Sequence, residues 1–382
     1  MNKLKNLYIL HILNDGFQAS ILLLLPFIAK ELNLDQIQVG FLGGTLNILL
    51  VILALPAGYL ALKFGSFKLL LYGLLLYVIG YFATALSPNF FFLIPVFLFT
   101  GIGFSLFHPV AFALVTRVSD KKERGKQMGN FTAIGDIGRI GISAVITFVI
   151  VYIGWRSSTF IQACFGLIIF IYIYFFTNIK DKTTHENIKP VDIKIKEFIK
   201  NRKFLFTSFA GALDSFASST LFVFLPFLLL YRGVDPKVLG SFTAAFFIGN
   251  LLGKSILGRF VDKFGSASIF IIAEILMAIL IFVLANTPSF LIIIIASVAL
   301  GIFTKGTAPV IQTMVSESVE HHGNYEKAFG LNSFVNGIAA TLAPITLGFF
   351  SKNFGIVTAF NISAIFALLA IVPAIGFRMI KE

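Results

Sequence analysis

The sequence predicts an all-α membrane protein with twelve transmembrane helices, arranged as two pseudo-symmetric six-helix bundles. The chain has 382 residues, of which 57% are hydrophobic and only 13% are charged, and its mean hydropathy is +0.92. A soluble domain is nearer a quarter charged and could not bury this much apolar surface. Two further observations support the prediction. Apolar segments of membrane-spanning length fill the chain, and its second half repeats the first.

The repeat consists of residues that recur at a constant offset of two hundred positions. Leu25-Pro26-Phe27 recurs as Leu225-Pro226-Phe227, and Lys63-Phe64-Gly65-Ser66 recurs as Lys263-Phe264-Gly265-Ser266. A constant offset is hard to obtain by chance from apolar composition, so it indicates two copies of one unit fused in the same orientation. Parallel repeats of this kind build membrane transporters with a site between the halves. A duplication without functional consequence is the alternative.

Twelve apolar segments of about twenty residues each can be separated at turn signals. In the first half they span 7–29, 37–61, 67–86, 89–116, 127–153 and 157–178. In the second half they span 204–230, 236–261, 267–286, 289–315, 327–350 and 355–377. Because the bilayer interior offers irregular backbone no hydrogen-bond partners, we expect every segment to be helical.

Residues that favour helix starts stand before several of these segments. Asp35 lies three residues before Gln38, which is a capping-box pattern, and Asp235 precedes a proline at the first helical position. Ser87-Pro88 and Thr287-Pro288 give the same signal before the fourth and tenth segments. The sequence therefore predicts helix N-termini at these four places.

Basic residues alternate between the predicted loops. Most Lys and Arg lie in the termini and in every second loop, and the opposite loops hold only Lys30, Arg156, Arg232, Lys237 and Lys352. This bias predicts that both termini are cytoplasmic. It also accounts for the net charge of +12 without a nucleic-acid partner, because basic loops are attracted to anionic lipid.

The expected organisation is an N-terminal bundle over 1–178, a basic linker over 179–203 and a C-terminal bundle over 204–382. Apolar residues interspersed in the linker favour an amphipathic segment on the membrane surface, and a solvated tether is the alternative. We expect a multi-pass protein of the plasma membrane. It would act as a monomer, bind a small-molecule substrate and protons, and need no cofactor or metal.

One motif makes the chain similar to a known family. Gly258-Arg259-Phe260-Val261-Asp262-Lys263-Phe264-Gly265 follows the loop motif of the major facilitator superfamily, and Gly58 to Gly65 is a second copy with Leu62 in place of the acid. Gly58 and Gly258 would permit close helix approach, and Gly65 and Gly265 a tight turn. The resemblance implies that Asp262 and Lys263 help to latch one conformation, and that the first copy is a weaker latch.

A finer resemblance is to the fosmidomycin-resistance branch of efflux carriers. It rests on four runs: His11-Ile12-Leu13-Asn14-Asp15-Gly16, Leu24-Leu25-Pro26, Gly101-Ile102-Gly103 and Phe107-His108-Pro109. Ile142-Ser143 stands where a Gly-Pro associated with antiporters would be expected. The resemblance therefore implies efflux, while this departure weakens the inference of antiport.

Seven charged residues lie inside the predicted spans and away from the span ends: Asp15, Asp136, Arg139, Asp214, Lys254, Glu274 and Lys305. Each costs about 2.5–3.5 kcal/mol at a helix centre, so such groups persist where they face water or one another. All except Glu274 lie on helices that line the central cavity in the superfamily, as the resemblance implies. Glu274 could snorkel, pair with a loop residue or mark an interface.

Spacing assigns expected roles to these residues. His11, Asp15 and Gln18 share a face of the first helix, and Asp136 can pair with Arg139 at i, i+3. The predicted substrate ligands are Arg139, Lys254, Lys305, His11, Gln18, Asn250, Asn332 and Asn336. The predicted proton-coupling residues are Asp15, Asp136, Asp214 and His108. Structural ion pairs and a hydrogen-bonded structural histidine are the alternatives.

The sequence thus predicts a secondary active transporter that works by alternating access, moving a small organic solute in proton-coupled drug or anion efflux. No Gly-x4-Gly-Lys-Ser/Thr motif for ATP is present. Three cations in the cavity would suit an anionic or zwitterionic substrate, a preference that disappears if the aspartates neutralise them. Import or exchange of a small anionic metabolite is the main alternative, and a membrane sensor or an intramembrane enzyme is less favoured.

Overall fold

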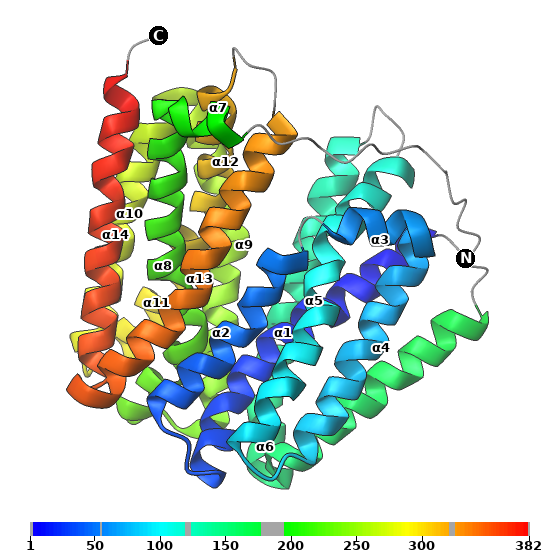
Figure 1. Ribbon diagram of the computed structural model, residues 1–382. Coiled ribbons are helices and arrows are strands. Elements are labelled where there is room, and N and C mark those ends of the chain that lie inside the picture. Colours follow the sequence, from blue (N-terminus) through cyan, green and yellow to red (C-terminus); the bar gives the residue numbers. More distant parts are fainter. Residues whose placement is uncertain (1–2, 54–55, 119–123, 177–194, 321–324, 381–382) are drawn as a thin grey trace. The chain divides into compact units, whose positions relative to one another are not determined.

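The computed structural model describes residues 3–53, 56–118, 124–176, 195–320 and 325–380, and they are almost entirely helical (Figure 1). The helices of the first half are α1 (Lys3–Glu31), α2 (Gln36–Leu53), α3 (Pro56–Phe64), α4 (Ser66–Ala85), α5 (Phe90–Val118) and α6 (Arg124–Phe176). Those that follow are α7 (Ile195–Lys200), α8 (Arg202–Tyr231), η1 (Pro236–Val238), α9 (Leu239–Phe264), α10 (Ser266–Asn286), α11 (Phe290–Lys305), α12 (Thr307–Ser318), α13 (Tyr325–Phe354) and α14 (Ile356–Met379).

Within the described residues, 11 helices are long and apolar enough to cross a membrane. One of them, Asn130–Phe176, has 47 residues and covers two of the predicted segments. It contains a kink at Gly154, whose φ of 78° is not helical. The described residues of the twelve predicted segments are therefore almost entirely helical, and the sequence prediction of an all-α membrane protein is confirmed.

The two-hundred-residue repeat is visible in the helix boundaries. α3 ends at Phe64 and α9 ends at Phe264, while α4 begins at Ser66 and α10 begins at Ser266. Gly65 and Gly265 separate these helices with φ values of 88° and 81°, which residues with a Cβ rarely adopt. The predicted tight turn of the loop motif is thus confirmed in both copies.

The loop motif also predicted a close helix approach at its first glycine and a latch at its acidic residue. A Cβ placed on Gly258 would meet no described atom within 4 Å, so the expected close helix approach is not found there. Gly58, Leu62 and Asp262 lie outside the residues whose side chains are described, and the predicted latch stays a prediction.

Two of the four predicted helix caps form as expected. Gln38 N–H donates to Asp35 Oδ1 at 2.9 Å, while Asp35 N–H donates to Gln38 Oε1 at 3.0 Å, which completes the capping box. Asp235 accepts from the backbone N–H of Lys237 at 2.8 Å.

The other two helices begin after the predicted positions. At α5, Asn89 accepts from the backbone N–H of Phe92 at 3.0 Å, so Asn89 rather than Ser87 is the cap. At α11 the N-cap is Ser289 rather than Thr287. A proline disfavours the helical conformation for the residue before it, and Thr287 is accordingly extended, with φ −89° and ψ 138°. The polar residue after the proline then starts the helix.

The contacts divide the chain into two units. The first holds the described residues of Met1–Gln38, Thr45–Asn187 and Asp235–Ala244, and the second holds those of Val39–Gly44, Ile188–Val234 and Ala245–Glu382. In the first unit α1 packs on α6, and α4 packs on α5 and α6. In the second unit α8 packs on α13 and α14, and α10 packs on α14.

Most of the predicted linker lies outside the described residues, except for α7 and the start of α8. Phe198 of α7 is 5% exposed and packs on Phe204 of α8, with ring centroids 5.1 Å apart. This side chain therefore belongs to the core of the second unit, whereas the sequence analysis expected it on an amphipathic surface segment. Ile199 beside it is exposed.

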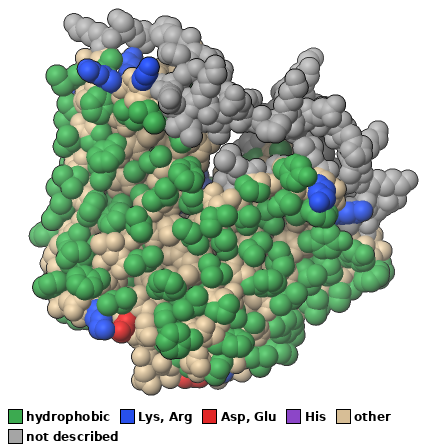
Figure 2. Space-filling model, in the orientation of Figure 1, with side chains coloured by type: hydrophobic (Ala, Val, Ile, Leu, Met, Phe, Trp, Pro, Cys, Tyr) green, Lys and Arg blue, Asp and Glu red, His purple; other side chains and the backbone are tan. Residues whose placement is uncertain are grey.

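The described surface is rich in large apolar side chains. Figure 2 shows one face on which hydrophobic groups are widespread and the basic side chains lie near its margins. Examples of exposed apolar residues are Phe91, Phe175, Phe176 and Val372. Exposed apolar area on this scale is unfavourable in water, so it indicates contact with lipid.

A hydrogen-bonded clamp joins α1 to the second part of α6. Glu31 accepts from Trp155 Nε1 at 2.6 Å and from Arg156 Nε at 2.8 Å. Arg156 also donates through Nη1 to the carbonyl oxygen of Ala85, at the end of α4, at 2.9 Å. The clamp therefore fastens three helices of the first unit at one end.

We expect Glu31→Ala to destabilise the first unit, because it leaves the buried Trp155 N–H without its acceptor. The loss should be about 1 kcal/mol, since the carboxylate itself is half exposed. Glu31→Gln, which keeps an acceptor, should lose less. Thermal unfolding of the purified protein in detergent measures both, and equal unfolding temperatures for wild type and Glu31→Ala would contradict the clamp.

Candidate functional site

The first unit contains a buried polar cluster built from three helices. α1 supplies His11 and Asp15, α5 supplies His108, and α6 supplies Asp136 and Arg139. His11, Asp15 and Asp136 are each at most 2% exposed. Groups of this kind persist inside an apolar bundle only when they satisfy one another, and the contacts below show that they do.

Arg139 joins two carboxylates in this cluster. Its Nη1 donates to Asp136 Oδ1 at 2.7 Å, so the predicted i, i+3 pair on α6 is confirmed. Its Nη2 lies 2.8 Å from Asp15 Oδ2 on α1. The planar guanidinium presents its donors in a fixed fork, and Asp136 therefore orients the nitrogen that faces Asp15.

Two histidines contact the same Asp15 carboxylate. His11 Nε2 lies 3.2 Å from Oδ2, and His108 Nε2 lies 3.3 Å from Oδ1. The side chains of His108 and Arg139 are 29% and 21% exposed, so the cluster is open on that side. Asn14 donates to Asp15 Oδ1 at 3.0 Å, which completes the surroundings of the carboxylate.

The hydrogen bond made by His11 Nδ1 determines which atom of the ring can carry a hydrogen toward Asp15. His11 Nδ1 lies 2.8 Å from the carbonyl oxygen of Phe131, which can only accept, so Nδ1 carries a hydrogen. In a neutral ring Nε2 then presents a lone pair to the carboxylate of Asp15. Two acceptors at 3.2 Å repel each other unless a proton lies on one of them. The His11–Asp15 pair is therefore a place for one additional proton.

Gly135 makes room for this pair. A Cβ at Gly135 would lie 2.5 Å from both Asp15 Oδ2 and His11 Nε2. No spacing in the sequence connects this glycine with α1. Because any side chain here would push α1 and α6 apart or displace the polar pair, only glycine is compatible with the observed contacts.

The guanidinium of Arg139 disfavours a metal ion in this cluster. His11, Asp15 and His108 offer three ligand atoms within 4.8 Å of one another. However, Arg139 already contacts the Asp15 carboxylate at 2.8 Å, and its positive charge would repel a metal ion bound there. The arrangement can transfer a proton between His11 and Asp15, and it holds a guanidinium whose partner depends on that proton.

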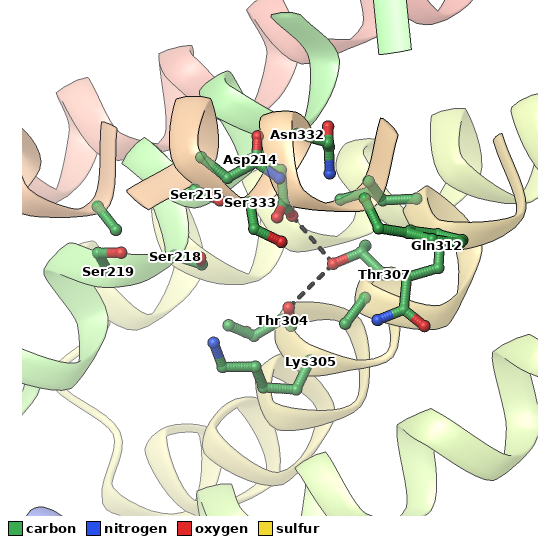
Figure 3. A pocket seen from close by; sticks show the side chains of 15 residues that line it. Asp214, Ser215, Ser218, Ser219, Thr304, Lys305, Thr307, Gln312, Asn332 and Ser333 are labelled. Carbon is green, nitrogen blue, oxygen red and sulfur yellow. Dashed lines mark hydrogen bonds between the residues drawn. The ribbon is translucent and has the colours of Figure 1, made fainter. Parts of the chain in front are cut away.

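The second unit contains a polar pocket of about 450 Å³ (Figure 3). Its walls come from α8, the junction of α11 and α12 at Gly306, and α13. The lining polar residues are Asp214, Ser215, Ser218, Ser219, Thr304, Lys305, Thr307, Gln312, Asn332, Ser333 and Asn336. Predicted segment 289–315 is thus two helices that meet beside Lys305, and this junction forms part of the pocket wall.

Some groups in the pocket wall are bonded and others are not. Thr307 Oγ1 lies 3.0 Å from Asp214 Oδ1 and 3.0 Å from the carbonyl oxygen of Thr304. The Oδ1 atoms of Asn332 and Asn336 are buried without a hydrogen-bond partner among the described residues. Unpartnered amide oxygens at a cavity wall indicate a place where a ligand or water donates.

The predicted ligands of the second half divide into two groups. Lys305, Asn332 and Asn336 line the pocket together with Asp214. Lys254 and Asn250 on α9 do not line it; Asn250 is 1% exposed and Lys254 is partly buried. In the first unit Gln18 is partly buried on α1, about one turn after Asp15. The roles predicted for Lys254, Asn250 and Gln18 stay predictions.

Sequence reasoning did not place Glu274. It treated the residue as peripheral, whereas the structure buries it completely on α10. Its carboxyl lies within hydrogen-bonding reach of Asp214 on α8. The two residues are sixty positions apart, so no local spacing could have linked them. The only available signal was the high cost of a carboxyl group within a predicted span.

Two repeated helical units with lipid-facing surfaces and buried polar clusters define a membrane transport protein. A family model described as "Major Facilitator Superfamily" matches residues 7–212 and 207–382. The chain therefore belongs to the major facilitator superfamily, whose members transport small solutes, and it is a transporter rather than an enzyme. It is a multi-pass protein of the plasma membrane.

Curated relatives at 24–25% identity carry names of inorganic anion transporters. The chain is 24% identical over 368 residues to the "Probable nitrate transporter NarT" of Staphylococcus aureus, covering 93% of this chain and 91% of the relative. It is 25% identical over 376 residues to the protein of the same name in Staphylococcus epidermidis, covering 94% and 92%. It is 24% identical over 300 residues to the "Nitrite extrusion protein" of Bacillus subtilis, covering 77% and 72%.

Solved structures of similar fold include two transporters. The nucleoside transporter NupG aligns with a TM-score of 0.80 at 17% identity, covering 100% of this chain and 100% of that one. A bacterial homolog of the human lysosomal transporter Spinster, in an inward-facing and occupied conformation, aligns with a TM-score of 0.79 at 16% identity, covering 98% and 96%. At these identities the likeness shows the fold alone.

We expect Gly135→Ala to disrupt the Asp15 cluster, because the new methyl group would overlap both His11 and Asp15. Gly141→Ala on the same helix is the matched control, since a Cβ there would meet no described atom within 4 Å. Thermal unfolding of the two purified variants should show a clear loss of stability for Gly135→Ala only. Equal unfolding temperatures for the two variants would contradict the close packing around the pair.

Proposed function

We propose that the protein is a secondary active transporter that carries a small anion together with a proton in the same direction. The observation that supports this most directly is the His11–Asp15 contact, which requires an additional proton, next to a guanidinium bound to the same carboxylate. In this proposal both termini lie in the cytoplasm, the two bundles rock about the substrate site, and the monomer is the working unit.

The mechanism rests on competition for Arg139. While Asp15 is ionised, its carboxylate occupies the Nη2 side of the guanidinium. A proton that moves from His11 to Asp15 neutralises this carboxyl group and weakens its hold on Arg139. A substrate anion can then take the vacated position, while Asp136 keeps the guanidinium oriented through Nη1.

The charge balance explains why proton and anion would bind together. With both histidines neutral, Asp15 and Asp136 outweigh Arg139 by one negative charge, so the cluster offers no attraction to an anion alone. Binding one proton and one anion leaves the net charge of the cluster unchanged, which limits the electrostatic cost of loading in a low-dielectric bundle. Exchange of a proton for an anion would instead concentrate negative charge there, so the geometry favours symport over antiport.

His108 offers an entry for the proton. Its Nε2 contacts the Asp15 oxygen that His11 does not, and its side chain is far more exposed than those of His11 and Asp15. The relatives named for nitrate and nitrite suggest small oxyanions as the first substrates to test.

A second candidate is transport of a larger polar organic solute. The pocket of the second unit supports it, because a volume of about 450 Å³ lies within the range typical of small-molecule sites and its wall holds hydroxyl and amide groups. Lys305, Asn332 and Asn336 would then be ligands, as the sequence analysis predicted. Efflux of a drug-like compound, which the sequence analysis also predicted, belongs to this candidate.

Uptake of labelled nitrate, nitrite and formate into proteoliposomes tests the first candidate. We expect acid outside to accelerate uptake, and a proton ionophore to abolish the acceleration. Arg139→Gln should lower apparent affinity about tenfold or more, because it removes a charge-assisted hydrogen bond of about 1.5–3 kcal/mol. Lys237→Gln, a change in an exposed residue of η1, is the matched control and should leave uptake unchanged.

The Asp15→Asn variant separates proton coupling from binding. Because the amide cannot titrate, uptake should continue down the anion gradient but lose its dependence on external pH. An unaltered pH profile in Asp15→Asn would show that the coupling proton binds elsewhere. Failure of every small anion, together with uptake of a larger polar solute, would favour the second candidate.

A further inference from the structure

The second unit contains a buried pair of carboxyl groups that the mechanism above does not use. Asp214 on α8 and Glu274 on α10 are 5% and 0% exposed, and their carboxyl groups lie within hydrogen-bonding reach of each other. Two ionised carboxylates this close in an apolar interior repel strongly, and neither can donate to the other. The contact therefore requires a proton between them.

The surroundings of Glu274 offer its carboxylate no donor. Both of its carboxyl oxygens lack a hydrogen-bond donor among the described residues. A buried carboxylate with no donor is not stable, whereas a protonated carboxyl that donates to Asp214 is satisfied. Glu274 is thus able to hold the shared proton while Asp214 accepts from it.

The surroundings of Asp214 suit both locations of the proton. Thr307 has one hydroxyl hydrogen but lies 3.0 Å from two acceptors, Asp214 Oδ1 and the carbonyl oxygen of Thr304 (Figure 3). When Asp214 is ionised, the hydroxyl can donate to it. When Asp214 carries the proton, it can donate to Thr307, whose hydroxyl then turns to Thr304. Asp214 and Thr307 therefore stay hydrogen-bonded at either location of the proton.

One positive charge balances the pair. Lys305, at the end of α11, lines the pocket beside Asp214 and interacts with it electrostatically. Of the other charged groups on the elements that pack against α10, Glu317 accepts from Ser266 at the first residue of α10, and Arg378 is exposed near the end of α14. The net charge of the two carboxyl groups, one shared proton and Lys305 is zero. Removal of the proton leaves one buried negative charge.

We propose that Asp214, which lines the pocket, and the fully buried Glu274 share one proton and form a second proton-binding site that is independent of Asp15. The site also points to a ligand, because the buried Oδ1 of Asn332 in the same wall has no described partner. A ligand that brings an amine or hydroxyl to Asp214 would displace the proton toward Glu274. Occupancy of the pocket and protonation of the pair are thus linked.

Infrared spectroscopy of the full-length protein in lipid tests this without knowledge of the substrate. Wild type should show a protonated-carboxyl band that disappears as the pH is raised and shifts in D₂O. Glu274→Gln should remove the band, because Asp214 can then stay ionised beside Lys305. Asp214→Asn should keep the band at every pH at which the protein is folded, because Glu274 no longer has a carboxylate partner.

Further variants make the result specific. Thr307→Ser keeps the hydroxyl and should titrate as wild type does, whereas Thr307→Val should shift the midpoint of the titration. Asp15→Asn should leave the band of the Asp214–Glu274 pair unchanged. The proposal for this pair and the function proposed for Asp15 are therefore tested independently, and either can fail while the other stands. Glu274→Met, of similar volume, replaces Glu274→Gln if the amide does not fold.

Two results would overturn the proposal. One is the absence of a titrating carboxyl band in wild-type protein. The other is a band with the same midpoint in wild type and in Asp214→Asn, because Glu274 would then hold a proton without sharing it.

Discussion

The contact between Arg139 and the two carboxylates of Asp15 and Asp136 is the interaction on which the first unit depends. A guanidinium inside an apolar bundle is tolerable only when its charge and its donors are matched, and two aspartates on different helices provide that match. The pairing also ties α1 to α6, beside the glycine that lets these helices approach. The chemistry of the site and the packing of the unit are therefore the same set of contacts.

The two units stabilise their buried charged groups in different ways. The first surrounds one carboxylate with a guanidinium and two imidazoles, so that its proton and its counterion compete for Asp15. The second brings two carboxyl groups together and provides a hydroxyl that bonds to Asp214 whether or not it is ionised. Duplication supplied the same helices twice, but different side chains on them now create two different polar environments.

The lipid environment strengthens the electrostatic interactions within these clusters. In water an exposed ion pair contributes little, because solvent competes for each partner. Inside a bundle whose outer surface carries side chains such as Phe175 and Phe176, solvent competes much less, and a change of one proton alters which groups are satisfied. The chain belongs to a superfamily that transports small solutes, and in the proposed function this sensitivity lets protonation or ligand binding favour one conformation.

The sequence by itself determined whatever depends on composition, on the internal repeat or on short spacing. Composition and segment length predicted the helical spans, the constant offset predicted the repeat with its turns at Gly65 and Gly265, and i, i+3 spacing predicted the Asp136–Arg139 pair. Only the tertiary structure decided which helices bring their polar groups together. His108 reaches Asp15 and Glu274 reaches Asp214 across many residues of chain, and such contacts depend on helix packing and rotation, which local sequence patterns do not encode.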